Sequence, residues 1–192
     1  EFQVNTSTEN KLREPSITQL VDGGFVVTWS NGSGISGQRY DSHGNLVGSE
    51  FQVSTSTERL FNGGLLSSLT QLGDGGFIVT WSSQDISSGT WNVHAQRYDI
   101  DGKPIGSEFQ VNTYSHKVQF MSSIADLGNS KFIVTWMSQD QDGSYMGIFG
   151  QIFETESTVQ EQIQSTEIYF GEDLHTEGSD VRMEDCPKTD QA

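Results

Sequence analysis

The stretch GGFIVTW at residues 75–81 occurs three times with small changes, as GGFVVTW at 23–29 and as KFIVTW at 131–136. In each copy Phe, Val and Trp alternate with Ile or Val and Thr, so successive side chains point to opposite faces of an extended strand. Both faces are largely apolar. We therefore expect three central strands that are covered on both sides. The tryptophans could also stack on sugars, but a Trp at one register of every repeat is more often packing. They are Trp29, Trp81 and Trp136.

A longer pattern surrounds these strands and repeats about every 50–58 residues, a period typical of propellers and stacked β arrays. Each copy holds four short strand candidates, in the first copy EFQV, SITQL, FVVTWS and GQRYD, separated by turn signals such as Asp-Gly-Gly. Four antiparallel strands in about 50 residues is the size of a propeller blade. We expect an all-β fold of three blade-like, β-propeller-type repeats, at about 1–49, 50–107 and 108–153, with an acidic extension at 154–192.

A glutamine recurs in the fourth candidate strand of every repeat. Gln38 and Gln96 precede Arg-Tyr, and Gln151 precedes Ile-Phe. A repeated buried amide usually bonds to the backbone of a neighbouring strand or turn, so we expect a structural role, with ligand binding as the alternative.

The charge is strongly negative and unevenly spread. The net charge is −16, and residues 154–192 hold 11 of the 26 acidic residues and 2 of the 10 basic ones. Such a chain repels phosphate backbones, so we expect no nucleic-acid partner. No apolar run approaches the roughly 20 residues of a spanning helix, and we expect no membrane insertion. The lone cysteine, Cys186, excludes an intrachain disulfide framework.

The pattern GGF-[IV]-V-T-W, then QRYD, then GSEFQVNT, resembles the tandem repeats of very large secreted or surface proteins of bacteria and ciliated protists. The resemblance covers residues 1–153 and implies an extracellular or cell-surface repeat scaffold without a catalytic set. The chain starts at Glu1 with no basic-then-apolar leader, which we interpret as a trimmed precursor.

The connections after the third candidate strand read SSQDISSGTW at 82–91 and MSQDQDGSYMG at 137–147. They resemble the Ser-x-Asp-x-Gly-x-x-Trp turn of sialidase-type propellers, so we expect Asp85 and Asp140 to tie turns. DIDG at 99–102 and DQDG at 140–143 also resemble the start of a calcium loop, but the distal Glu is missing. Ordinary hairpins are the favoured interpretation. Weak calcium binding is the alternative, with Asp99, Asp101, Asp140 and Asp142 as ligands.

The four histidines fall at unrelated repeat positions, so no zinc site is expected, and no nucleophile motif is present. We expect a chain that is not an enzyme and has no cofactor. Two sequons, at Asn5 and Asn31, make it a possible glycoprotein.

The chain begins with an EFQV that follows no QRYD, and GQIF at 150–153 is followed by no fourth EFQV. An unpaired edge strand is a template for pairing with another chain. We therefore expect strand donation head-to-tail between copies, giving an oligomer or a filament. The interface would comprise Glu1, Phe2, Gln3, Val4, Ile148, Phe149, Gln151, Phe153, Ile168, Tyr169 and Phe170.

The expected function is that of a non-enzymatic structural or adhesive module whose partners are copies of itself. The alternative is a calcium-dependent or carbohydrate-binding, lectin-like module with glycan partners.

Overall fold

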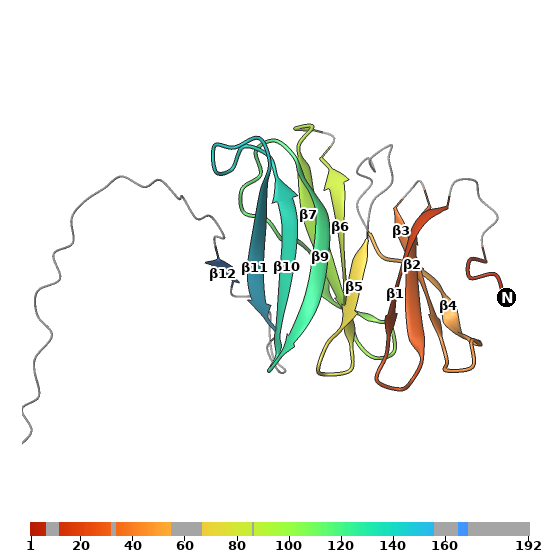
Figure 1. Ribbon diagram of the computed structural model, residues 1–192. Helices are drawn as coiled ribbons and strands as arrows, with labels where there is room; N and C mark the ends of the chain where they lie inside the picture. Colours follow the sequence, from red (N-terminus) through yellow and green to blue (C-terminus); the bar gives the residue numbers. More distant parts are fainter. Residues whose placement is uncertain (7–11, 32–33, 55–66, 86, 156–164, 169–192) are drawn as a thin grey trace, which may run out of the picture.

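The protein is described by a computed structural model that covers residues 1–6, 12–31, 34–54, 67–85, 87–155 and 165–168. These residues form strands and turns, and no helix occurs among them. Three antiparallel sheets follow one another across the molecule in chain order (Figure 1). The expectation of an all-β fold is confirmed for the described residues.

Each sheet has four strands in sequential order. The first sheet contains β1 (Arg13–Gln19), β2 (Phe25–Ser30), β3 (Ile35–Tyr40) and β4 (Leu46–Gln52). The second contains β5 (Ser68–Gln71), β6 (Phe77–Gln84), β7 (Trp91–Tyr98) and β8 (Pro104–Gln110). The third contains β9 (Gln119–Gly128), β10 (Lys131–Ser138), β11 (Gly147–Glu154) and β12 (Ser165–Ile168).

The expected repeat boundaries are wrong by one strand. EFQV was expected to open each unit, but in β4 and β8 it closes the preceding sheet by pairing with the QRY strand. The hairpin turn explains this pairing. The Asp41 carboxylate accepts the backbone N–H groups of His43 and Asn45, both at 2.8 Å, and so turns the chain directly from β3 into β4.

The expectation that GQIF lacks a fourth-strand partner is also wrong. β12 pairs antiparallel with β11, and Ile168 lies opposite Gly150. In the second sheet Phe109 lies opposite Ala95, at the corresponding position. Ile168 therefore occupies the place of the Phe in EFQV, and the edge of β11 is already paired within the chain.

The central strands are covered on both faces, as the alternation predicts. Phe77, Val79 and Trp81 of β6 pack with residues of the first sheet in one core cluster. Ile78, on the opposite face of β6, packs with the third sheet in a second cluster. The three tryptophans are all buried, which agrees with packing rather than with an exposed sugar platform.

A polar contact accompanies the apolar packing between neighbouring sheets. The hydroxyl oxygens of Thr28 and Ser67 lie 2.9 Å apart, and Ser122 Oγ donates to Thr80 Oγ1 at 3.1 Å. Thr28 and Thr80 hold the same position in β2 and β6. Because a buried hydroxyl needs a partner, these bonds fix how one sheet lies on the next.

Gln38 and Gln96 lie in the third strand of their sheets, β3 and β7, and bond across a bulge in the fourth strand, β4 or β8. In the first sheet the register shifts between Gly37 and Arg39, opposite Gly48, whose φ is 70°. Gln38 Nε2 donates to the carbonyl oxygens of Arg39 and Val47, at 2.9 and 3.2 Å. Gln96 makes the same contacts in the second sheet, to Arg97 and Ile105. Gln38 and Gln96 thus have the backbone-bonding role that their repetition indicates, and the same role for Gln151 stays a prediction.

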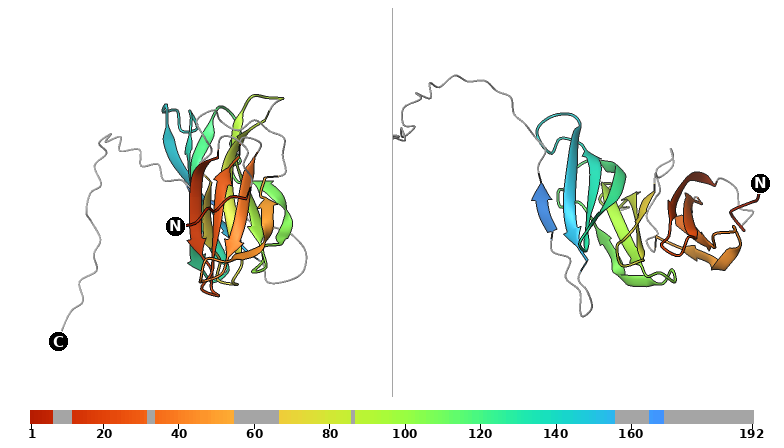
Figure 2. Two further views of the ribbon diagram at one scale, coloured as in Figure 1. Left: turned by 90° about the vertical axis from the view of Figure 1, so that its right-hand side faces the viewer. Right: turned by 60° about the horizontal axis from the view of Figure 1, so that its bottom comes forward.

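The three sheets lie side by side as successive layers, with the first sheet at one end and the third at the other (Figure 2). In the part of the chain that the structure describes, no helix has the length and hydropathy that crossing a membrane requires.

We predict that Trp81→Ala lowers the free energy of unfolding by about 3–5 kcal/mol, because Trp81 is fully buried between two sheets and its loss leaves a cavity. Urea unfolding followed by circular dichroism would measure this. Tyr145→Ala is the matched control, since Tyr145 is exposed and its loss should change stability little. Equal stability of the two variants would contradict the assignment of Trp81 to the core.

Candidate functional site

The turn aspartates hold local backbone, but not at both expected positions. Asp85 Oδ1 accepts the backbone N–H groups of Ser87 at 2.7 Å and Ser88 at 3.1 Å. In the third sheet the equivalent bonds go to Asp142 rather than Asp140, since Asp142 Oδ1 accepts from Ser144 N and Oγ at 2.9 and 2.6 Å. Asp140 instead begins that turn with a φ of 61°. The expected role of Asp140 therefore belongs to Asp142.

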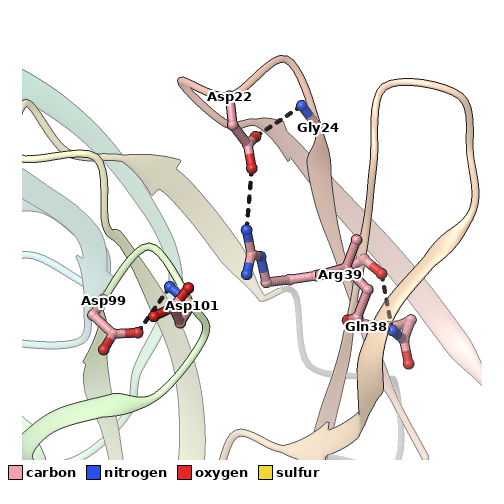
Figure 3. A network of polar contacts seen from close by, with 7 residues as sticks. Asp22, Gly24, Gln38, Arg39, Asp99 and Asp101 are labelled. Carbon is pink, nitrogen blue, oxygen red and sulfur yellow. Dashed lines mark hydrogen bonds and ion pairs between the residues drawn. The ribbon is translucent and has the colours of Figure 1, made fainter.

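The other proposed calcium ligands lie in the turn between β7 and β8. Asp99 Oδ1 accepts the backbone N–H groups of Asp101 and Lys103, at 2.9 and 2.8 Å, so one of its oxygens is engaged in closing the hairpin (Figure 3). Within the described residues, no group of three or more His, Cys, Asp or Glu side chains is placed to hold a metal ion. Calcium binding stays a prediction.

An ion pair recurs between the turn before the second strand and the third strand of a sheet. Asp22 accepts from Gly24 N at 2.9 Å, and its other oxygen lies 3.3 Å from Arg39 Nη2 (Figure 3). Asp74 and Arg97 form the same pair in the second sheet. Arg39 is buried, and its stem lies against Gly102 of the second sheet, where an added Cβ would approach Arg39 Cδ to 3.1 Å. The pair thus belongs to the contact between sheets.

The remaining candidate surfaces are the outward faces of the two end sheets. On the first sheet, Val27, Trp29 and Tyr40 form a cluster that Val4 and Leu12 partly cover. The Tyr40 hydroxyl donates to Val4 O at 2.6 Å, and the rings of Phe2 and Tyr40 lie 5.6 Å apart. Residues 1–6 are not a strand here. They lie on the face of the first sheet rather than on the edge of β11.

The contact of the N-terminal segment with Tyr40 resembles the contact that the first sheet makes with Tyr98 of the second sheet. In the second sheet the Tyr98 hydroxyl donates to Val53 O at 3.4 Å, and Phe51 lies 5.4 Å from the Tyr98 ring. Burial raises the pKa of Tyr98, and the charge of Glu108 adds to the rise. The pKa of Tyr40 is raised for the same reasons, with Glu50 as the charge. Both hydroxyls therefore stay protonated and serve as donors.

The structure divides the expected interface residues of β11 between its two faces. Phe149, Gln151 and Phe153 are buried, and the two phenylalanines pack toward the second sheet. These side chains are therefore engaged within the chain, and their role in contacts between chains stays a prediction. Ile148 points the other way and is exposed on the outward face. Tyr169 and Phe170 lie outside the described residues.

The two sequon asparagines are half-buried. Asn31 Nδ2 donates to Ser36 Oγ at 2.7 Å, a bond that a glycan on this nitrogen would disturb. Glycosylation stays a prediction.

Sequence reasoning treated STEIYFG at 165–171 as a strand candidate that contacts a neighbouring copy, and it missed that Ser165–Ile168 pairs with β11 of the same chain, although a weak signal for this pairing exists. Ser165-Thr166-Glu167-Ile168 aligns with Gly106-Ser107-Glu108-Phe109, with a hydroxyl residue, a Glu and an apolar residue in the same order. The glycine that permits the bulge is absent, and β12 pairs with β11 in simple register. The degenerate fourth strand lies within the acidic segment, which has no other similarity to the repeats.

No protein-family model and no curated protein sequence matches the chain. Among solved structures, it is similar to an endo-arabinase from Bacteroides thetaiotaomicron VPI-5482, with 16% sequence identity and a TM-score of 0.42. The match covers 72% of this chain and 55% of the endo-arabinase chain. A TM-score of this size does not define a common fold, so the likeness assigns no activity or site.

We predict that acid weakens the turn that Asp142 holds. Hydrogen bonds from Ser144 lower the pKa of Asp142 below its ordinary value. Its contribution to stability is therefore complete above the unfolded-state pKa, about 4, and is lost as pH falls through the lower folded-state pKa. Ser144→Ala should raise the pKa of Asp142 toward its ordinary value in an NMR carboxyl titration. Ser87→Ala should do the same for Asp85, and an unchanged titration in both variants would contradict the turn-holding role.

Proposed function

We propose that the chain is a non-enzymatic structural or adhesive module of an extracellular assembly, built from propeller-type blades with an acidic C-terminal extension. It associates with copies of itself head-to-tail. The extracellular location rests on the resemblance of its repeats to those of large secreted and surface proteins.

The main support is the repeated interface between sheets. A phenylalanine of the fourth strand packs on an aromatic ring of the following sheet at both interfaces: Phe51 lies 5.4 Å from Tyr98, and Phe109 lies 5.7 Å from Phe153. Repeated units that share core clusters with their neighbours are typical of scaffolds built by stacking.

The polar groups support a framework role as well. The carboxylates of Asp41, Asp85, Asp99 and Asp142 each accept backbone N–H groups of their own turn. Because such bonds shape hairpins, these acids serve the framework rather than the chemistry of a substrate. Because β12 pairs with β11 within the chain, the association that we propose uses the outward sheet faces.

We predict that light scattering of the purified chain over a concentration series shows a mass that rises above the 21.2 kDa of one chain. Because the chain carries a net charge of −16, added salt should promote this association by screening repulsion. A mass that stays at one chain under all conditions would contradict the proposal.

A glycan array with and without calcium, together with a panel of polysaccharides tested for hydrolysis, should give no signal. Calcium-dependent glycan binding would replace the scaffold by a lectin-like module, and hydrolysis would make the chain an enzyme.

A further inference from the structure

We propose that the outward face of the third sheet docks on the outward face of the first sheet of a second copy, and so repeats the sheet-to-sheet interface that the chain already forms twice. This inference rests on the proposed self-association and specifies its surfaces and its mode. Faces pack against each other, and no strand is added to an edge.

The third sheet exposes the apolar positions that its two predecessors bury. Ile148 of β11 is 59% exposed, whereas Ile35 and Val93, at the same position of β3 and β7, are both 0% exposed. Leu127 is 49% exposed, whereas Leu20 and Leu72, which precede β2 and β6 at the same spacing, are 1% and 3% exposed. Ile35 and Leu20 pack against the second sheet, and Val93 and Leu72 pack against the third. The outward face of the third sheet therefore resembles one half of these interfaces, and among the described residues no further sheet covers it.

The first sheet carries the complementary half. Its outward cluster of Val27, Trp29 and Tyr40 corresponds to Val79, Trp81 and Tyr98, which receive the first sheet in the internal interface. Ile17 of β1 is 63% exposed, whereas Leu69, its counterpart in β5, is 7% exposed because the first sheet covers it. A docked sheet would cover Ile17 in the same way.

Residues 1–4 already fill part of this receiving face. The carbonyl oxygen of Val4 accepts a hydrogen bond from the Tyr40 hydroxyl, as the carbonyl oxygen of Val53 does from the Tyr98 hydroxyl. Residues 1–4 therefore lie where the end of the fourth strand of a preceding sheet would lie. The ring of Phe2 meets Tyr40 at an interplanar angle of 51°, the same as that of Phe51 and Tyr98. Phe2 remains 57% exposed. A sheet docked beside it would cover this ring.

A second copy of this chain is the occupant that fits, because one chain carries both halves of the interface at opposite ends. The contact is heterologous, so repetition gives a closed ring or an open filament. It differs from the internal interfaces at one point. Pro15 stands where Ser67 and Ser122 bond to the threonine of the preceding sheet, so Thr135 would gain no such bond. The contact between copies should therefore be weaker than the contacts within the chain.

Two variants, each of which disrupts one of the two docking faces, test this pairing. Ile148→Asp damages the third-sheet face and Ile17→Asp damages the first-sheet face, and both side chains are exposed in the single chain, so folding should survive. Each variant alone should associate at least about a hundredfold more weakly than the parent, because docking would bury an unpaired charge. Mixed in equal amounts, the two should form a dimer through the one intact pair of faces. Ile105→Asp, in the middle sheet, is the matched control and should associate as the parent does.

Sedimentation velocity distinguishes the outcomes, with circular dichroism melting to verify folding. A parent chain that stays monomeric overturns the proposed self-association and this inference together. A parent that associates while both variants associate equally well overturns only the choice of faces. Loss of association in only one variant overturns the head-to-tail pairing and indicates contact between like faces, and loss in both variants without recovery on mixing also overturns the head-to-tail pairing.

Discussion

A four-stranded sheet of this chain is apolar on both faces, and each face has to be covered by another sheet. In β6 the set Phe77, Val79 and Trp81 faces the first sheet while Ile78 faces the third. Removing one such side chain from water contributes about 1.5–3 kcal/mol, more than an exposed ion pair contributes. Stability is therefore shared between neighbours. A sheet at either end of the stack retains one face whose burial is incomplete.

Repeated polar groups stabilise the sheets and the contacts between them. Gln38 and Gln96 donate to backbone carbonyl oxygens where the fourth strand bulges. Arg39 is held by Asp22 while it lies against the second sheet. The contacts Thr28 with Ser67 and Thr80 with Ser122 set the relative position of the layers. The glutamines act within a sheet, whereas Arg39 and the threonine–serine bonds act between neighbouring sheets.

Periodicity was sufficient to predict the strands and the burial of Trp29, Trp81 and Trp136, because alternation reports directly which side chains share a face. It did not show where one sheet ends, since a repeat has the same period wherever it is cut. The short turn held by Asp41 carries that information, because a tight hairpin favours pairing of the strands on either side of it.

The outward faces could not be recognised from sequence. Ile148 and Ile35 look alike as residues of a third strand, and only the arrangement of the sheets shows that one is exposed and the other buried. The same holds for residues 1–4, whose EFQV reads as a strand but packs on a face. Asp140 and Asp142 were indistinguishable as turn residues until the direction of each carboxylate was known. Contacts distant in sequence decide the first two cases, and the local bonds from Ser144 to Asp142 decide the third.

The dependence of each sheet on its neighbours is tested most directly by native-state amide hydrogen exchange of the chain at a concentration where it is a single molecule. The account predicts slowest exchange in β6 and β7, which have a sheet on both sides, and faster exchange in β2, β3, β10 and β11. Equal protection in the three sheets, or fastest exchange in the middle one, would contradict the claim that stacking stabilises the fold.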